Sequence, residues 1–193
     1  MGKKNIGART FLPTMPIALV GTSSKGKPNY MAAGFVGGLN IRPPIVAIGI
    51  NQKHQTRIGI DENQAFSVNF PTADMVEIVD YCGLVSGRTT DKTELFKTFY
   101  GDLESIPMIE ECPINLECKL KQQIDFGFDV AFFGEIINVY VNEDVLTENK
   151  VDMVKVNPLV YAGDGQYYKL GEKLGSGWSI GKNFKSKNKS KGE

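Results

Sequence analysis

Most of this chain consists of short apolar runs, each followed by a cluster of turn-forming residues. Residues 16–22 form one such run, and the turn cluster at 23–28 leads into a second strand-like segment, which is the pattern of a β-hairpin. Residues 45–50 form a third predicted strand, because the preceding Pro43 and Pro44 favour extended backbone and do not fit inside a helix. The first quarter of the chain is therefore expected to be β-structure.

Further strands follow from alternation of apolar and polar residues. In residues 66–70 every second side chain is aromatic or β-branched, with Ser67 and Asn69 on the opposite face. In residues 114–124 apolar and polar side chains also alternate, which predicts one buried face and one face in water. Residues 132–141 form a long strand. Residues 159–170 form two strands around Asp164-Gly165, a dipeptide typical of a type I′ hairpin turn.

Three segments have helical character. Residues 56–62 are compatible with a short helix, and residues 74–84 place Met75, Ile78, Val79 and Cys82 on one helical face, with Thr72 or Asp74 as the N-cap. Residues 91–100 are expected to form another helix, which turns its apolar side chains inward. Helices that interrupt long antiparallel stretches favour a mainly β fold, a β-barrel with α insertions, over a doubly wound parallel sheet.

Composition narrows the class of protein. With 193 residues and 41% hydrophobic content, the chain is long enough for one domain, which we place at residues 1–181, followed by a Lys-rich disordered tail at 182–193. The 22 basic and 22 acidic residues cancel, which argues against nucleic acid or a membrane as partner. The three cysteines lack the paired spacing of a disulfide framework or a zinc site, so we expect no metal and a cytoplasmic location.

Two polar clusters are candidates for ligand binding. The small-residue stretch at 29–35 would let a flat ligand approach the backbone, and the turn that carries His54 and Thr56 would hold an anion, so a phosphorylated aromatic cofactor suits both. Residues 86–92 offer a second anion site with Arg88 and Lys92. The alternatives are an ordinary polar turn for the first cluster and a capped helix start for the second.

Several other sites are less favoured. Residues 34–38 lack the glycine spacing of a dinucleotide fingerprint and lead to a double proline instead of a helix. His54 is the only histidine, and no nucleophile elbow is visible near it, which argues against a hydrolase. Cys82 is expected in the core. Trp178, Tyr167 and Tyr168 are able to stack on a planar ring, but aromatic residues near a chain end more often close a core or a subunit contact.

In their order, these segments resemble the flavin reductase-like, FMN-binding split-barrel family, and within it the flavoredoxin-like branch. The resemblance covers residues 13–181. It is carried by PIALVGT, NYMAAGF, RPPIVAIGI, KHQTRIGI with ENQAFSVNF, YCGLVSGRTTDK and NPLVYAGDGQYYKLGE. The order and spacing of these pieces, more than any one of them, make the match specific.

The resemblance implies a homodimer with FMN bound in each subunit, in a groove near the subunit contact. Carried onto this sequence, the ring and ribityl chain would lie along Asn29, Met31, Ala32, Ala33 and Gly34. The phosphate would approach Asn51, His54 and Thr56, and the site would be completed by Ser86, Gly87, Arg88 and Lys92. Many relatives carry a hydroxyl residue where this chain has Ala33 or Gly34, so we expect a backbone N–H to replace that side-chain contact here.

The implied reaction is hydride transfer from NADH or NADPH to the flavin, followed by electron transfer to an unidentified acceptor. The flavin supplies the chemistry, so no general base is required, and Arg88 and Lys92 are candidates for stabilising the reduced flavin. One alternative is a non-enzymatic FMN electron carrier of the flavoredoxin type. Another is an amine oxidase that resembles pyridoxamine-phosphate oxidase.

Overall fold

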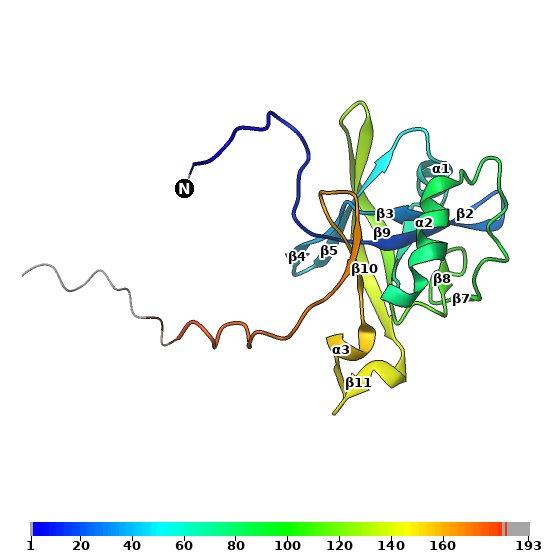
Figure 1. The fold of residues 1–193 in the computed structure, drawn as a ribbon. Coiled ribbons are helices and arrows are strands. Elements are labelled where there is room, and N and C mark those ends of the chain that lie inside the picture. Colours follow the sequence, from blue (N-terminus) through cyan, green and yellow to red (C-terminus); the bar gives the residue numbers. More distant parts are fainter. Residues whose placement is uncertain (1, 183, 185–193) are drawn as a thin grey trace, which may run out of the picture.

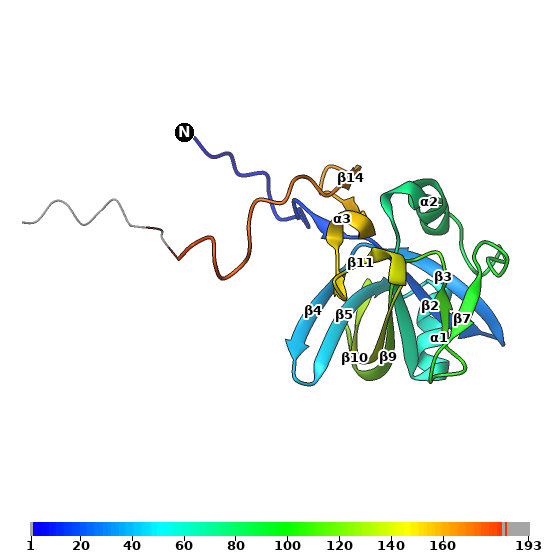
Figure 2. The same ribbon diagram turned by 90° about the horizontal axis from the view of Figure 1, so that it is seen from below.

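The computed structural model describes residues 2–182 and 184. Its main feature is a seven-stranded antiparallel sheet that curls into a split barrel (Figures 1 and 2). The strand order is β3-β2-β6-β9-β10-β5-β4. The strands are β2 (Ala18–Ser24), β3 (Lys27–Ala33), β4 (Val36–Ile41), β5 (Pro44–Asn51), β6 (Ala65–Phe70), β9 (Ile114–Asp125) and β10 (Asp129–Val141). The expected mainly β fold is confirmed.

Smaller elements surround the barrel. One sheet joins β1 (Met15–Pro16), β13 (Leu159–Tyr161) and β14 (Tyr167–Lys169), and two hairpins pair β7 (Thr98–Tyr100) with β8 (Pro107–Ile109) and β11 (Leu146–Thr147) with β12 (Lys150–Val151). The helices are α1 (Gln55–Asn63), α2 (Val76–Leu84) and α3 (Met153–Val156), with 3-10 turns at Ala73–Met75 and Glu143–Val145. In the part of the chain that the structure describes, no helix has the length and apolar character to cross a membrane.

Strand β3 separates two hydrophobic cores. Its side chains alternate, so that Met31 and Ala33 pack inside the barrel, whereas Tyr30 packs on the opposite side in a second core with Val79 and Cys82 of α2. Both faces of this strand are therefore covered. The residues of β3 lie where α1 and α2 approach the sheet from different sides, and this position generates the candidate site.

The strands expected at 16–22, 45–50, 66–70, 114–124 and 132–141 are all present, as are the helices expected at 56–62 and 74–84. The predicted cap at the start of the second helix is wrong, because the Thr72 side chain makes no capping hydrogen bond and Asp74 lies within the 3-10 turn. The expected tail falls mainly on residue 183 and residues 185–193, which lie outside the described part of the chain.

The helix predicted at 91–100 is wrong. Residues 91–97 form turns, and the segment ends in β7. The Asp91 carboxylate accepts a hydrogen bond from the Thr93 backbone N–H at 2.9 Å, which favours a turn, and the Lys92 side chain points inward to backbone carbonyls. Phe96 is nevertheless buried as predicted, edge-on to the Tyr30 ring at a centroid distance of 5.5 Å. The apolar residues of this segment signalled burial and not a helix.

The prediction of a solvent-exposed polar face for residues 114–124 is wrong at its first two polar positions. Asn115 and Glu117 are buried, because the β7–β8 hairpin and its loop cover this part of β9. The Asn115 amide donates to the Ile109 carbonyl at 2.9 Å and to the Asn69 side chain at 2.8 Å. These residues pair with one another because water is excluded from this region.

The hairpin at 159–170 is present, but its turn differs from the predicted type I′. Only Gly165 of the Asp164-Gly165 pair has a positive φ, at 79°. Gly165 N–H donates to the Ala162 carbonyl at 2.9 Å, and Ala162 N–H donates to the Gln166 carbonyl at 3.0 Å. This is a three-residue loop with glycine at its left-handed position, which is the next most common way to close a hairpin.

We expect Glu117→Ala to lower the free energy of unfolding by about 2–4 kcal/mol. The buried Glu117 carboxylate accepts hydrogen bonds from Leu103 N–H at 2.6 Å, Asp102 N–H at 3.3 Å, the Asn138 amide at 2.8 Å and the Tyr140 hydroxyl at 3.3 Å. Its removal leaves these donors unpaired. Urea denaturation followed by circular dichroism measures the change, with Glu104→Ala, an exposed glutamate of the same loop, as control. Equal stability of the two variants would contradict a structural role for Glu117.

Candidate functional site

Two adjoining hollows lie where β3, the start of α1 and the segment after α2 meet. The inner hollow, of about 120 Å³, is lined by His54, Thr56, Met31 and residues 82–87, and the outer hollow, of about 660 Å³, is lined by Arg88 and residues of the β2–β3 hairpin. The two share part of their lining, namely Asn29, Gln55, Gly87 and Lys92. Both predicted polar clusters therefore contribute to one region of the surface.

The N-terminus of α1 faces this region without a side-chain cap. His54 occupies the N-cap position in extended conformation, its side chain makes no capping hydrogen bond, and the first turn carries no acidic residue. A helix N-terminus presents backbone N–H groups and the positive end of the helix dipole. The nine-residue helix α1 is thus arranged to accept an anion.

A buried cation lies opposite this helix start. The Lys92 side chain is 3% exposed, and its ammonium donates to the Tyr30 and Cys82 carbonyls, each at 2.9 Å. Among the described residues it forms no ion pair with a carboxylate. Burial lowers the pKa of Lys92, and the nearby Cys82 thiol opposes this effect. The hollow thus has a positive charge in its wall that forms no ion pair with a carboxylate in the described part of the chain.

The floor between the two hollows is polar and closely packed. The Asn29 amide donates to the Thr56 hydroxyl at 2.9 Å, and both side chains are buried. Gly87 lies directly against this pair, because a Cβ atom there would collide with the Asn29 side chain and touch Gln55. Ser86 starts the adjoining turn, since its carbonyl accepts the Thr90 N–H at 2.9 Å. The absence of a side chain at Gly87 therefore allows the loop to lie close to Asn29 of β3.

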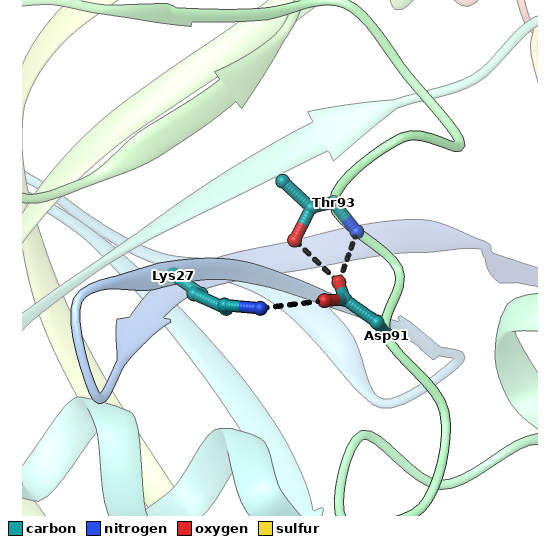
Figure 3. A network of polar contacts seen from close by, with 3 residues as sticks. All are labelled: Lys27, Asp91 and Thr93. Atoms are coloured by element: carbon teal, nitrogen blue, oxygen red, sulfur yellow. Dashed lines mark hydrogen bonds and ion pairs between the residues drawn. The ribbon is translucent and has the colours of Figure 1, made fainter.

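An exposed ion pair holds the same loop on its other side. The Lys27 ammonium at the start of β3 donates to the Asp91 carboxylate at 2.9 Å, and Asp91 also accepts hydrogen bonds from the Thr93 backbone and hydroxyl (Figure 3). These contacts lower the pKa of Asp91, with the Thr93 hydroxyl as the largest cause. Residues 86–92 are thus connected to β3 twice, by Lys27 outside and by Lys92 inside.

A third hollow, of about 330 Å³, lies farther along β3 and includes Ala32, Gly34, Gly83, Tyr161 and Tyr167 in its wall. Gly83 also lines the inner hollow, so the two are neighbours. The two tyrosine rings are 5.2 Å apart. We call this the tyrosine hollow, and its small residues and aromatic rings suit a flat ligand.

The Tyr167 hydroxyl donates to the Asp80 carboxylate of α2 at 2.9 Å. Burial, with help from Asp80, raises the pKa of Tyr167 to about 12. The hydroxyl therefore stays protonated at neutral pH. It holds the β13–β14 hairpin to α2 and fixes one wall of the tyrosine hollow.

The structure divides the predicted site residues into three groups. Around the inner and outer hollows it brings together eight of them: Asn29, Met31, His54, Thr56, Ser86, Gly87, Arg88 and Lys92. Ala32 and Gly34 line the tyrosine hollow instead. Ala33 packs in the barrel core, and the Asn51 amide bonds the Phe128 carbonyl at 3.0 Å and the Asp129 carboxylate at 3.2 Å, which shapes the turn beside α1.

Sequence reasoning missed Gln55, Asp80, Gly83 and Tyr161. Tyr161 lies in the block NPLVYAGDGQYYKLGE, which pointed to the neighbouring Tyr167 and Tyr168. Of these two, Tyr167 lines the tyrosine hollow, whereas Tyr168 is exposed and bonds Asp164 at 2.6 Å. Cys82 is buried, in agreement with its expected place in the core. Strand alternation was the available signal, because it places Tyr161 and Tyr167 on one face of the hairpin.

Comparison with known proteins identifies the family. Residues 12–171 match the family model described as flavin reductase like domain, so the chain belongs to that family. The crystal structure of a flavoredoxin from Methanosarcina acetivorans is 43% identical and aligns with a TM-score of 0.91 over 94% of this chain and 98% of that one. Flavoredoxin of Desulfovibrio vulgaris (Miyazaki F) is 34% identical, with a TM-score of 0.88 over 94% and 100% of the two chains.

The chain is also similar in sequence to proteins without an assigned function. An uncharacterized protein from Archaeoglobus fulgidus is 30% identical over 129 residues, which is 66% of this chain and 72% of that protein. The family-model match and the two flavoredoxin structures confirm the resemblance to the flavin reductase-like family and its flavoredoxin branch. The roles of the individual site residues stay predictions.

The single histidine provides a direct probe of the positive charge at this site. Partial burial and then the Lys92 charge lower the pKa of His54, Arg88 lowers it further, and Asp129 raises it. We expect Arg88→Gln and Lys92→Met each to raise this pKa, because a neighbouring positive charge is removed. Added inorganic phosphate should raise it as well, so phosphate affinity should fall as pH increases through the pKa of His54.

An NMR titration of the His54 ring protons measures this pKa with and without phosphate. Lys25→Gln, which removes an exposed cation from the outer hollow, is the control and should leave the pKa nearly unchanged. A wild-type pKa that neither Arg88→Gln nor phosphate moves would show that His54 does not share an anion site with Arg88.

Proposed function

We propose that this protein is an FMN-dependent redox protein that binds its cofactor along β3. The observation that carries the proposal is the uncapped N-terminus of α1 beside the buried, unpaired Lys92 ammonium. A phosphate dianion would satisfy both, since it accepts hydrogen bonds from the helix amides and offsets the buried charge. Membership of the flavin reductase like family supports flavin as the group that carries this phosphate.

The shape of the surface supports the same ligand. The phosphate would be held at the inner and outer hollows by the start of α1, His54 and Arg88. The ring would lie in the tyrosine hollow against Ala32 and Gly34, which lack bulky side chains. Gly83 borders the inner hollow and the tyrosine hollow, so it lies where the connecting ribityl chain would pass. The residues present therefore fit a flat phosphorylated cofactor.

FMN, when bound, would supply the redox chemistry, namely hydride transfer from NADH or NADPH and electron transfer to an acceptor. The protein's own residues bind and orient it. Asn29 and Thr56 provide a fixed polar floor, Lys92 contributes positive charge from the wall, and Tyr161 and Tyr167 limit the space open to water. Arg88 and Lys92 line the phosphate end in this arrangement, so we propose anion binding as their main role.

A second candidate is an FMN electron carrier that takes electrons from a partner protein and does not use a nicotinamide nucleotide. It is favoured by the high similarity to two proteins named flavoredoxin, at 43% and 34% identity. Both candidates use the same cofactor site. They differ in the electron donor, and a donor experiment separates them.

We expect anaerobic addition of NADH or NADPH to the FMN-loaded protein to bleach the flavin absorbance. Apo-protein with no flavin serves as the blank, and free FMN with the same donor gives the uncatalysed rate. Bleaching by a reduced iron–sulfur protein, with no response to either nucleotide, would reject the reductase and support the carrier. Peroxide production from an amine under air would instead indicate an oxidase. A protein that retains no FMN after loading would contradict the proposal as a whole.

The double variant His54→Ala/Arg88→Ala should weaken FMN binding at least about tenfold, because it removes two exposed donors from the phosphate end. Both side chains are exposed, so the free energy of unfolding should stay within about 0.5 kcal/mol of wild type. Quenching of flavin fluorescence on titration with apo-protein measures the dissociation constant. Riboflavin, which has no phosphate, should bind both proteins equally.

The matched control is Lys119→Ala/Lys150→Ala, which removes two exposed lysines that line neither the inner nor the outer hollow. This pair should change the FMN dissociation constant by no more than about twofold, since exposed charges at a distance are screened. An equal loss in both double variants would mean that general charge, and not a defined phosphate site, attracts FMN.

A further inference from the structure

The segment after β14 forms an apolar arm that leaves the body of the protein. We call residues 170–182 the C-terminal arm, and both ribbon views show it extending away from the barrel (Figures 1 and 2). Its large apolar side chains are exposed: Leu174 is 88%, Trp178 100% and Ile180 69% accessible. Such side chains on a separate segment indicate a surface that another molecule covers.

The arm has local structure of its own. Ile180 N–H donates to the Ser176 carbonyl and Lys182 N–H to the Ser179 carbonyl, each at 3.0 Å. Gly175 packs against Ile180, because a Cβ atom there would lie 2.5 Å from the Ile180 side chain. Trp178 has a φ of 60°, a left-handed conformation that is unusual for a bulky residue. The turn holds Trp178 outward at its tip, as an anchor residue would be held.

A matching surface lies on the same side of the chain. Strand β4 is an edge of the main sheet, with an unpaired side. It exposes Leu39 and Ile41, which are 60% and 85% accessible. In both views β4 and the C-terminal arm lie on the left side of the molecule (Figures 1 and 2). Unpaired apolar edge strands are usually covered in the functional protein.

We propose that two copies of this chain exchange C-terminal arms, and that Trp178 of each copy packs on the β4 side of the other. A two-fold contact would satisfy both features at once, since each chain contributes one arm and one edge. Leu170 and Trp178 are eight residue steps apart, so this segment spans up to about 26 Å when extended, which is long enough to reach an adjoining copy. The formal net charge of zero imposes no repulsion between copies.

This inference deepens the homodimer expected from the family resemblance by assigning the segment that holds it together. It does not depend on flavin, so FMN binding remains a separate readout on the same samples. The sequence contains one tryptophan, and its fluorescence therefore reports on the arm alone.

We expect wild-type protein, with or without FMN, to run as a dimer in size exclusion with light scattering. Its tryptophan emission should be blue-shifted and protected from acrylamide, and both properties should be lost together on dilution. Trp178→Ala should raise the dimer dissociation constant at least about 30-fold, the effect of removing a hot-spot anchor.

Ile41→Asp tests the receiving surface while keeping the fluorescent probe. It should produce monomers whose tryptophan emission is red-shifted and fully quenchable. Phe126→Asp is the matched control, because Phe126 is 71% accessible but lies in the β9–β10 turn, beside the Asn51 end of β5 and not the Pro44 end that pairs with Ile41. It should leave both the dimer and the emission unchanged.

Three results would overturn the inference. A stable dimer with a fully quenchable tryptophan would place the arm outside the interface. A monomer with a protected tryptophan would mean that the arm folds back on its own chain. Dissociation by Phe126→Asp but not by Ile41→Asp would place the contact at the opposite end of the sheet. Loss of FMN binding in a dimer with protected Trp178 would concern the proposed function alone.

Discussion

The candidate site depends on the buried Lys92 ammonium and its hydrogen bonds to the Tyr30 and Cys82 carbonyls, each at 2.9 Å. Through these two bonds one side chain connects β3, the end of α2 and the loop that carries Arg88. Burial of an ammonium without a carboxylate partner has a desolvation cost of several kcal/mol, on the order expected for buried ions, and two carbonyls offset only part of it.

For stability alone, a neutral side chain of similar length would serve better at position 92. We relate this charge to the proposed cofactor, because an anion in the adjoining hollow would offset the desolvation cost of the buried ammonium. The same reasoning applies to the N-terminus of α1, where no acidic side chain occupies the first turn. The phosphate of the proposed cofactor would stabilise both features at once.

The sequence predicted most of the barrel because its strands have apolar side chains at regular spacing. It failed where a contact distant in sequence decides the local structure. Residues 91–97 have helical apolar spacing, but the bonds of Lys92 to Tyr30 and Cys82 hold the segment in turns. Glu117 has the pattern of an exposed strand position, yet a loop that precedes it in the chain covers it.

The same limit applies to the site. The two polar clusters were visible in the sequence, and the fold brings most of their residues around one pair of hollows. The Asn51 amide bonds the β9–β10 turn instead of lining a hollow. Its partner there, Phe128, lies 77 residues farther along the chain, so local sequence does not reveal this contact. Tyr161 was missed because nothing local indicates that a hairpin close to the chain end packs against α2 and β3.

The β13–β14 hairpin connects the two proposals physically. Tyr161 and Tyr167 on this hairpin form a wall of the tyrosine hollow, and the C-terminal arm begins directly after β14. Tyr167 is held to α2 through Asp80, so the start of the arm has a fixed position relative to the ring site. A second copy that binds the arm would therefore hold a segment whose other end is already fixed beside the ring site. The Tyr167–Asp80 hydrogen bond thus separates the two proposals, because the wall of the tyrosine hollow is held within one chain whether or not the arm is bound.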